Sequence, residues 1–234
     1  MKTIGIVGGL GPEATSNYYK EIIGRFNEIN GNGSLNYPEI LIYSVNMSQF
    51  IGYMNDKQYT KAVDYLSIIL KRLKDAGADF AAISANTPHL LFDEIQAKSP
   101  LPLISIVEAV KDVATARKLK TTGLIGTRFT MNATFYQDIF RKAGISVVTP
   151  NESEIEIINE KLFCEIELGI YKDDTKRLLL DIVQGIIRRN NIDSLILGCT
   201  EFPIMFTEAE YLGIPFLNTT RIHVNAIVEE SLKG

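Results

Sequence analysis

The chain has 234 residues, of which 46% are hydrophobic and 22% are charged, and its formal net charge is -4 at pH 7. A chain of this size can bury ordinary cores and divide into two domains of about 100 residues each. The charges are spread without a block of lysine or arginine, which excludes the positive field that gathers nucleic acid or an anionic membrane surface. No apolar run reaches the roughly 18 residues of a membrane span. The sequence therefore predicts a globular enzyme or binding protein.

Short β-rich runs alternate with segments of helical spacing along the whole chain. The helical segments include residues 56–75, 131–142 and 173–189. The β-rich runs lack polar alternation, as expected for strands that helices cover on both faces. This alternation predicts an α/β fold built on mostly parallel sheets flanked by helices. The expected strands are residues 3–8, 39–45, 79–84, 102–105, 121–126, 145–149, 193–197 and 214–217.

The second half of the chain repeats the first. The stretch from Asp79 to Pro88 aligns without a gap with the stretch that begins at Asp193, 114 positions further along, and the match extends to both sides. An internal match of this length indicates two copies of one structural unit. We therefore expect two pseudosymmetric domains, residues 1–104 plus 214–234 and residues 105–213. The carboxyl ends of their strands, where ligands bind in parallel sheets, are expected to border a cleft that holds the active site.

A glycine-rich turn, Gly8-Gly9-Leu10-Gly11-Pro12, follows the first strand. It matches the G-x-G-x-x-A pattern of dinucleotide-binding turns, but the second strand lacks the acidic residue that would bind the ribose. A tight strand-to-helix turn with Pro12 in the first helical position explains the pattern as well. The N–H groups of such a turn also suit a substrate carboxylate.

Cysteine occurs twice, at Cys164 and Cys199. So few cysteines in a chain of this size indicate thiols in a reducing compartment, which favours a cytoplasmic protein. Cys164 is expected to pack within a helix. Cys199 is either a small buried hydrophobe or a reactive thiol, because it ends a strand just before a helix whose dipole would favour the thiolate. The matching residue in the first repeat is Ala85, which cannot transfer a proton.

Histidine also occurs only twice, at His89 and His223. His89 either faces the ligand or lies exposed in the first turn of a helix, and His223 is expected to be structural. The sequence shows no cluster of cysteine, histidine and carboxylate residues at ligand spacing, so we expect no metal site.

Three motifs together resemble the cofactor-independent aspartate/glutamate racemase family. They are Gly8 to Thr15, Asn86-Thr87-Pro88-His89 and Gly198-Cys199-Thr200-Glu201, and the resemblance covers essentially the whole chain. It implies a two-domain α/β fold, a homodimer, and an amino acid or other small carboxylic acid as ligand, with neither pyridoxal phosphate nor a metal. It also implies a two-base mechanism in which two cysteines exchange the α-proton on opposite faces. Only the second of these, Cys199, is present here, because Ala85 stands in the first position.

The resemblance also implies which residues surround the substrate. Small polar side chains and helix-start N–H groups would hold the amino and carboxylate groups, and Leu10-Gly11 would close the turn beside them. Relatives that select acidic amino acids place a basic residue after the second strand, where this chain has Gln49, and another on a helix of the second domain, near Glu167. The substrate is therefore expected not to be acidic. The expected substrate-binding residues are Leu10, Gly11, Gln49, Ala85, Asn86, Thr87, Thr127 and Thr200.

Three functions remain open from the sequence. The first is an amino-acid racemase in which Ser84, Thr87, His89 or a bound water serves the face opposite Cys199. The second is a decarboxylase or isomerase that works with one cysteine and protonates one face of an enediolate. The third is an amino-acid-binding protein without turnover.

Overall fold

The structure is a computed structural model that describes residues 1–31 and 33–233. The chain folds into two compact units, Met1–Ile106 with the chain from His223 onward, and Val107–Ile222. The sequence instead predicts that residues 214–234 belong to the first domain. The difference arises because the strand Ile214–Asn218 pairs within the second unit, so the return begins in the last helix.

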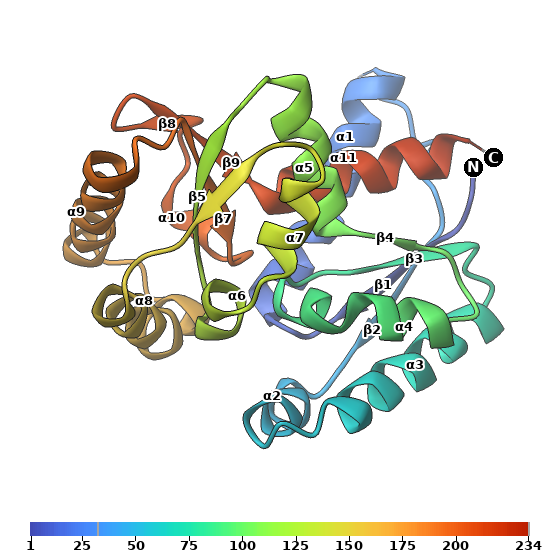
Figure 1. The fold of residues 1–234 in the computed structure, drawn as a ribbon. Coiled ribbons are helices and arrows are strands. Elements are labelled where there is room, and N and C mark those ends of the chain that lie inside the picture. Colours follow the sequence, from blue (N-terminus) through green and yellow to red (C-terminus); the bar gives the residue numbers. More distant parts are fainter. Residues whose placement is uncertain (32, 234) are drawn as a thin grey trace. The chain divides into compact units, whose positions relative to one another are not determined.

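The first unit is a four-stranded parallel sheet with the order β2-β1-β3-β4. Figure 1 shows helices α1 and α11 running beside each other in this unit. Buried side chains of both helices pack with Ile4, Ile6 and Phe80 of the sheet, and α3 packs against the same sheet. Its elements are β1 (Ile4–Gly8), α1 (Pro12–Asn30), β2 (Ile40–Ser44), α2 (Met47–Asn55), α3 (Tyr59–Asp75), β3 (Phe80–Ile83), a 3₁₀ helix (Thr87–Leu91), α4 (Phe92–Lys98), β4 (Leu103–Ile104) and α11 (Thr219–Leu232), whose first residues belong to the second unit.

The second unit repeats this topology in the strand order β6-β5-β7-β9-β8, in which only β8 is antiparallel. Side chains from α8 and α9 pack with the strands β5 and β7 to form its core. Its elements are α5 (Ile106–Ala116), which begins at the last residue of the first unit, β5 (Thr121–Gly126), α6 (Arg128–Asn132), α7 (Phe135–Arg141), β6 (Ser146–Val148), α8 (Glu152–Cys164), a 3₁₀ helix (Ile166–Leu168), α9 (Asp173–Asn190), β7 (Ser194–Gly198), α10 (Phe202–Met205), β8 (Glu210–Tyr211) and β9 (Ile214–Asn218).

Two aspartates show that the halves are structurally equivalent. Asp79 Oδ2 accepts a hydrogen bond of 2.8 Å from the backbone N–H of Thr3, just before β1. Asp193 Oδ2 accepts one of 2.6 Å from the N–H of Lys120, just before β5. Each aspartate thus fixes the start of the first strand of its own unit, which explains why the aligned stretches begin with this residue.

The expected α/β fold with parallel, helix-covered sheets is confirmed, and each expected strand coincides with an observed one to within one or two residues. The sequence did not indicate β8, a two-residue strand. The segment after β2 is the start of α2 rather than a loop, because the Asn46 side chain accepts a hydrogen bond from the Gln49 N–H and caps the helix. Among the described residues, no helix combines the length and the hydrophobicity that crossing a membrane requires.

Candidate functional site

The glycine turn after β1 is held in place by one threonine. Thr15 Oγ1 accepts a hydrogen bond of 2.8 Å from the Gly9 N–H and donates one of 2.9 Å to the Gly11 carbonyl. Gly9 has a φ of 82°, and a Cβ there would lie 2.5 Å from the Val45 carbonyl oxygen, so this position requires glycine. Pro12 begins α1, as expected for a tight strand-to-helix turn. Leu10 and Gly11 are both buried within it.

The end of β3 lies beside this turn. The Ser84 hydroxyl donates to the Val7 carbonyl over 3.2 Å and lies 3.4 Å from Thr15 Oγ1. Ala85, Asn86 and Thr87 follow and are nearly buried, with between 3% and 8% of their surfaces exposed. The structure thus brings the expected residues of the first unit to one edge of one sheet. Ser84 is already engaged by its neighbours.

His89 is buried, so the alternative that places it exposed in the first turn of a helix was wrong. Its Nε2 accepts a hydrogen bond of 3.2 Å from the Ile106 N–H, and its Nδ1 lies 3.0 Å from the Ala85 carbonyl oxygen. Because an amide N–H only donates and a carbonyl only accepts, the ring is neutral and carries its proton on Nδ1. Burial and the neighbouring His223 lower the pKa of His89 to about 3. His89 is therefore a positioning residue that holds the backbone at Ala85.

His223 is structural, as the sequence suggested. Its Nε2 donates to the Ile104 carbonyl over 2.8 Å, so its Nδ1 accepts the hydrogen bond of 2.9 Å from the Tyr18 hydroxyl. Burial lowers the pKa of His223 to about 4. The two histidines thus tie α11, α1 and the ends of β3 and β4 together within the first unit.

Gln49 lies in the first turn of α2 with an exposed side chain, whose Nε2 donates to the Tyr53 hydroxyl over 2.9 Å. Thr127 caps α6 at the end of β5: its Oγ1 accepts from the Thr130 N–H and lies 3.1 Å from Thr130 Oγ1. Both residues follow strands at the carboxyl edge of their sheets. The capping role expected of Thr127 is therefore present, and it leaves the backbone N–H groups at the start of α6 near the same edge.

Cys199 follows β7, the strand that pairs with β5 in the second unit. Gly198 ends this strand, and a Cβ there would lie 2.9 Å from the Ile125 carbonyl oxygen, so the close approach of β5 requires glycine. Cys199 belongs to the same cluster of buried residues as Ile166 and Phe202, and 5% of the residue is exposed. Burial alone would fit an inert thiol, but its polar neighbours do not.

Two carboxyl groups flank the Cys199 sulphur. Sγ lies 3.0 Å from Glu201 Oε2 and 3.5 Å from Glu167 Oε1, and the Thr200 hydroxyl donates to the same Glu201 oxygen over 3.0 Å. The other oxygen of Glu201 is buried and has no hydrogen-bond partner among the described residues. Thr200 therefore orients Glu201, and Glu201 in turn contacts the sulphur.

Three potential metal ligands that the spacing of the sequence did not reveal lie together in the second unit. Within the described residues, Glu167, Cys199 and Glu201 place one donor atom each within 4.8 Å of one another, a spacing that could hold a cation. The cluster could not be found from spacing in the sequence, since 32 residues separate Glu167 from Cys199. Three acidic groups in this space repel one another when ionised, and this repulsion raises their pKa values.

Burial and the charges of Glu201 and Glu167 raise the pKa of the Cys199 thiol well above its usual range. Burial also raises the pKa of Glu201, and burial together with the Glu201 charge raises the pKa of Glu167 to about 8. The expectation that a helix dipole favours the thiolate was wrong, because α10 has only four residues and two acids lie closer to the sulphur. All three shifts favour the uncharged forms, so ionising any one of these groups is opposed by burial and by its neighbours.

Glu165, only two residues before Glu167, is in the opposite electrostatic situation. It accepts hydrogen bonds from Thr175 and from Lys161, and it also pairs with Lys172. These partners lower the pKa of Glu165 to about 2. The lysines nearest in sequence to the cluster thus pair with Glu165.

Cys164, the other cysteine, is exposed, so the expectation that it packs within its helix was wrong.

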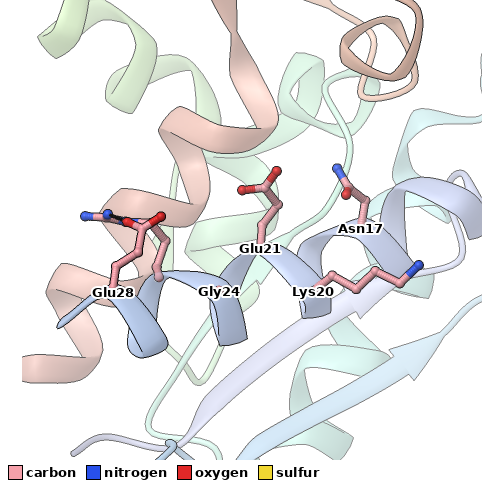
Figure 2. Close-up of a pocket in the computed structure, with 6 residues that line it drawn as sticks. Asn17, Lys20, Glu21, Gly24 and Glu28 are labelled. Atoms are coloured by element: carbon pink, nitrogen blue, oxygen red, sulfur yellow. Dashed lines mark hydrogen bonds and ion pairs between the residues drawn. The ribbon is translucent and has the colours of Figure 1, made fainter. Parts of the chain in front are cut away.

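A shallow hollow of about 160 Å³ lies along the outer face of α1, away from the strand ends. Figure 2 shows that its side chains point outward from one helix, with Gly24 leaving the gap between them. None of its residues was expected in the site, and Arg25 pairs with Glu28 across it. We therefore place the candidate site at the strand ends rather than here. The residues that line the hollow are Asn17, Lys20, Glu21, Gly24, Arg25 and Glu28.

Comparisons with known proteins identify the family of this chain. The family model for Asp/Glu/Hydantoin racemase matches residues 7–227. The chain is similar to the broad specificity amino-acid racemase RacX of Bacillus subtilis, with 26% identity over 200 residues and 85% of each chain covered. It is 28% identical over 154 residues to glutamate racemase of Aquifex aeolicus, which covers 64% of this chain but only 57% of that protein's length.

Among solved structures, the chain is similar to an aspartate racemase homologue from Pyrococcus horikoshii. The TM-score is 0.82 at 33% identity, over 99% of this chain and 100% of that one. The family match spans both units and all three motifs that carried the resemblance. The chain therefore belongs to the Asp/Glu/Hydantoin racemase family.

Proposed function

We propose that this protein is an amino-acid racemase that needs no pyridoxal phosphate and uses Cys199 to transfer the α-proton. The observation that carries the proposal is the contact of Sγ with Glu201 at the carboxyl end of β7. A thiol whose pKa is raised by burial is a poor base alone, so it needs an acceptor for its own proton. Glu201 is placed to be that acceptor.

Removal of the α-proton begins with a proton transfer inside the cluster. The Cys199 proton moves to the Glu201 carboxylate, and the resulting thiolate removes the α-proton. The electrons of the broken C–H bond pass into the substrate carboxylate, which becomes an enediolate. Return of a proton to the opposite face gives the other enantiomer, and in the reverse direction the neutral thiol is the acid.

We further propose that small polar side chains and a glycine turn hold the amino acid substrate. Asn86, Thr87, Thr127 and Thr200 supply small polar side chains near backbone N–H groups, and Leu10-Gly11 supplies the turn after β1. Such groups suit the carboxylate and ammonium of an amino acid. Their positions after strands support this role within each sheet, since parallel sheets bind ligands at that edge.

The opposite face lacks a cysteine, because Ala85 ends in a methyl group. Ser84 and His89 are poor candidates for the missing acid, since both are buried and bonded to backbone groups. Of the groups that the sequence leaves open for this face, we propose the Thr87 hydroxyl or a bound water. Either is a weaker acid than a thiol, so inversion is expected to be slower than proton removal at Cys199.

The same methyl group favours a second candidate function. An enzyme that protonates an enediolate from one face only, such as a single-cysteine decarboxylase or isomerase, needs no proton donor at position 85. A binding protein without turnover would also tolerate alanine there. These alternatives predict exchange without inversion, or no exchange at all.

The resemblance also leads us to propose a cytoplasmic homodimer. Both cysteines are free thiols in the structure, as a reducing compartment would keep them. Light scattering coupled to size-exclusion chromatography measures the mass of the assembly in solution. A mass of one chain, 26.1 kDa, would rule the dimer out.

The decisive experiment is incubation of the protein in D2O with each enantiomer of a panel of amino acids. Loss of the α-proton is followed by NMR and configuration by chiral chromatography. Exchange with inversion supports a racemase, and exchange with retention supports a single working base. No exchange with any amino acid would overturn the proposal and leave the decarboxylase and binding alternatives, which thermal-shift measurements with substituted malonates then divide.

A further inference from the structure

In the part of the chain that the structure describes, no cation stands ready to offset the acids around Cys199 when they ionise. Among the described residues, no lysine, arginine or histidine side chain pairs with Glu167 or Glu201, and none is a cause of their pKa shifts. The buried Glu201 Oε1 also lacks a hydrogen-bond donor. Buried acids are ordinarily paired, so the cluster is electrostatically incomplete as it stands.

The nearest lysines could not easily complete it. Lys161 lies 3.0 Å from Glu165 Oε1, and Lys172 lies 3.2 Å from the same oxygen. Thr175 donates to the other oxygen of Glu165. Turning either lysine toward Glu167 would break its ion pair with Glu165. A cation that stabilises the ionised form of Glu167 would therefore come from outside the chain.

The backbone holds Glu167 firmly in its place beside the sulphur. It lies in the 3₁₀ turn between Glu165, which caps α8, and Gly169, whose left-handed conformation ends the turn. Ile166 is fully buried in the core, whereas Glu167 is only partly buried. The carboxyl group is therefore fixed near Cys199 but still open to an incoming group.

We propose that Glu167 is a specificity residue that binds a positively charged side chain of the substrate, so that cationic amino acids such as lysine and ornithine are the preferred class. The inference rests on the proposed function, because it places the substrate's α-carbon at Cys199 Sγ. A reacting carbon lies about 3–3.5 Å from the attacking atom. Since Glu167 Oε1 lies 3.5 Å from the same sulphur, its carboxylate comes within about 7 Å of that carbon.

The side chains of cationic amino acids can span this distance. Lysine carries its ammonium on a flexible four-carbon stem, and that ammonium would supply both the charge and the donors that the cluster lacks. An acidic side chain would instead add a third carboxylate to two that already repel each other. A neutral side chain would leave the charge uncompensated.

The test compares lysine, its neutral analogue norleucine and glutamate as substrates of the wild-type protein. The expected kcat/KM for lysine exceeds that for norleucine by about tenfold or more, mainly through KM, and glutamate is the poorest of the three. Equal values for lysine and norleucine would overturn the inference. Racemisation of norleucine would in that case still support the proposed function, whereas no turnover of any of the three would count against the function itself.

Two variants separate side-chain recognition from other roles of Glu167. Glu167→Gln is expected to bring lysine and norleucine to within about threefold of each other, and Glu167→Lys to favour glutamate over lysine. The exposed Glu160 provides a matched control, and Glu160→Gln is expected to leave all three ratios unchanged. If Glu167→Gln lowers kcat/KM by the same factor for all three substrates, Glu167 does not distinguish their side chains, and the inference fails.

Discussion

The Sγ atom of Cys199 lies 3.0 Å from Oε2 of Glu201, with the Thr200 hydroxyl bonded to the same carboxyl oxygen. Three consecutive residues thus form a proton acceptor, its orienting donor and the thiol that it serves. Burial and this carboxylate together raise the pKa of the thiol, so Cys199 favours the protonated thiol over the thiolate. A racemase that works this way must move the thiol proton before it removes one from the substrate.

The first prediction concerns Glu201→Gln. The amide keeps the shape of the side chain but cannot accept the thiol proton as a base, so α-proton removal slows. We expect kcat/KM to fall by about a hundredfold or more, the usual scale for a general base. The rate of α-deuterium incorporation in D2O measures the effect.

The control for this substitution is Glu160→Gln on the exposed face of α8, which should leave the rate unchanged. Circular dichroism of both variants checks that the fold is intact. A folded Glu201→Gln protein with wild-type kcat/KM would remove Glu201 from the mechanism.

The second prediction is a fall in activity toward a neutral amino acid as the pH rises through about 8. The Glu167 carboxyl has its pKa raised to about 8 and faces Cys199 and Glu201. Below this pH the protonated carboxyl can donate to the forming thiolate, and above it a second negative charge opposes thiolate formation. The pH profile of kcat/KM reports the free enzyme, and norleucine is a suitable substrate.

In Glu167→Gln this limb of the profile should disappear, because the amide does not titrate. Any decline that remains belongs to the substrate amine or to other groups. A decline near pH 8 of equal size in both proteins contradicts the assignment to Glu167.

The third prediction concerns stability in acid. The pKa values of His89 and His223 fall from 6.5 to about 3 and about 4 in the folded protein, so both stay neutral while the unfolded chain takes up protons. Their contribution is fully present above pH 6.5 and is lost as the pH falls toward 4 and 3. Each pKa unit corresponds to about 1.4 kcal/mol of unfolding free energy.

Urea unfolding at a series of pH values between 7 and 4 measures this loss. His89→Asn keeps a donor near the position of Nδ1 but does not titrate, so its unfolding free energy should depend less steeply on pH than that of the wild type. Parallel pH dependences in the two proteins would show that His89 is not held neutral by the fold.

The fourth prediction concerns the missing thiol. Ala85→Cys should restore a second acid and raise the rate of inversion about tenfold or more, because a thiol donates a proton more readily than a hydroxyl or water. Chiral chromatography measures the product enantiomer. Ala85→Ser, of similar size, should give little gain, and a gain that survives the further change Cys199→Ala would argue against a two-sided mechanism.

Much of the fold could be predicted because it follows from local patterns. Apolar runs without alternation mark buried parallel strands, and the repeat from Asp79 to Asp193 predicted that the two sheets share one topology. The strand β8 is too short to leave a pattern. The course of the chain after residue 213 depends on the pairing of β9 with β7, which no local signal reveals.

The site could be predicted only where its residues are adjacent in the sequence. Cys199 and Thr200 stand out because they end a strand, and the capping of α6 by Thr127 follows from its residue type. The position of Glu167 beside the sulphur depends on how α8 and its 3₁₀ turn pack. For the same reason the expected direction of the pKa shift of Cys199 was wrong, since burial and two carboxyl groups outweigh a helix of one turn.

In the proposed mechanism the sulphur of Cys199 carries the α-proton. The decisive measurement is the rate at which Cys199→Ala incorporates solvent deuterium at the α-carbon of an amino acid that the wild type exchanges. We expect this variant to lose nearly all exchange while unfolding at the wild-type temperature. Exchange at an undiminished rate would show that another group removes the proton.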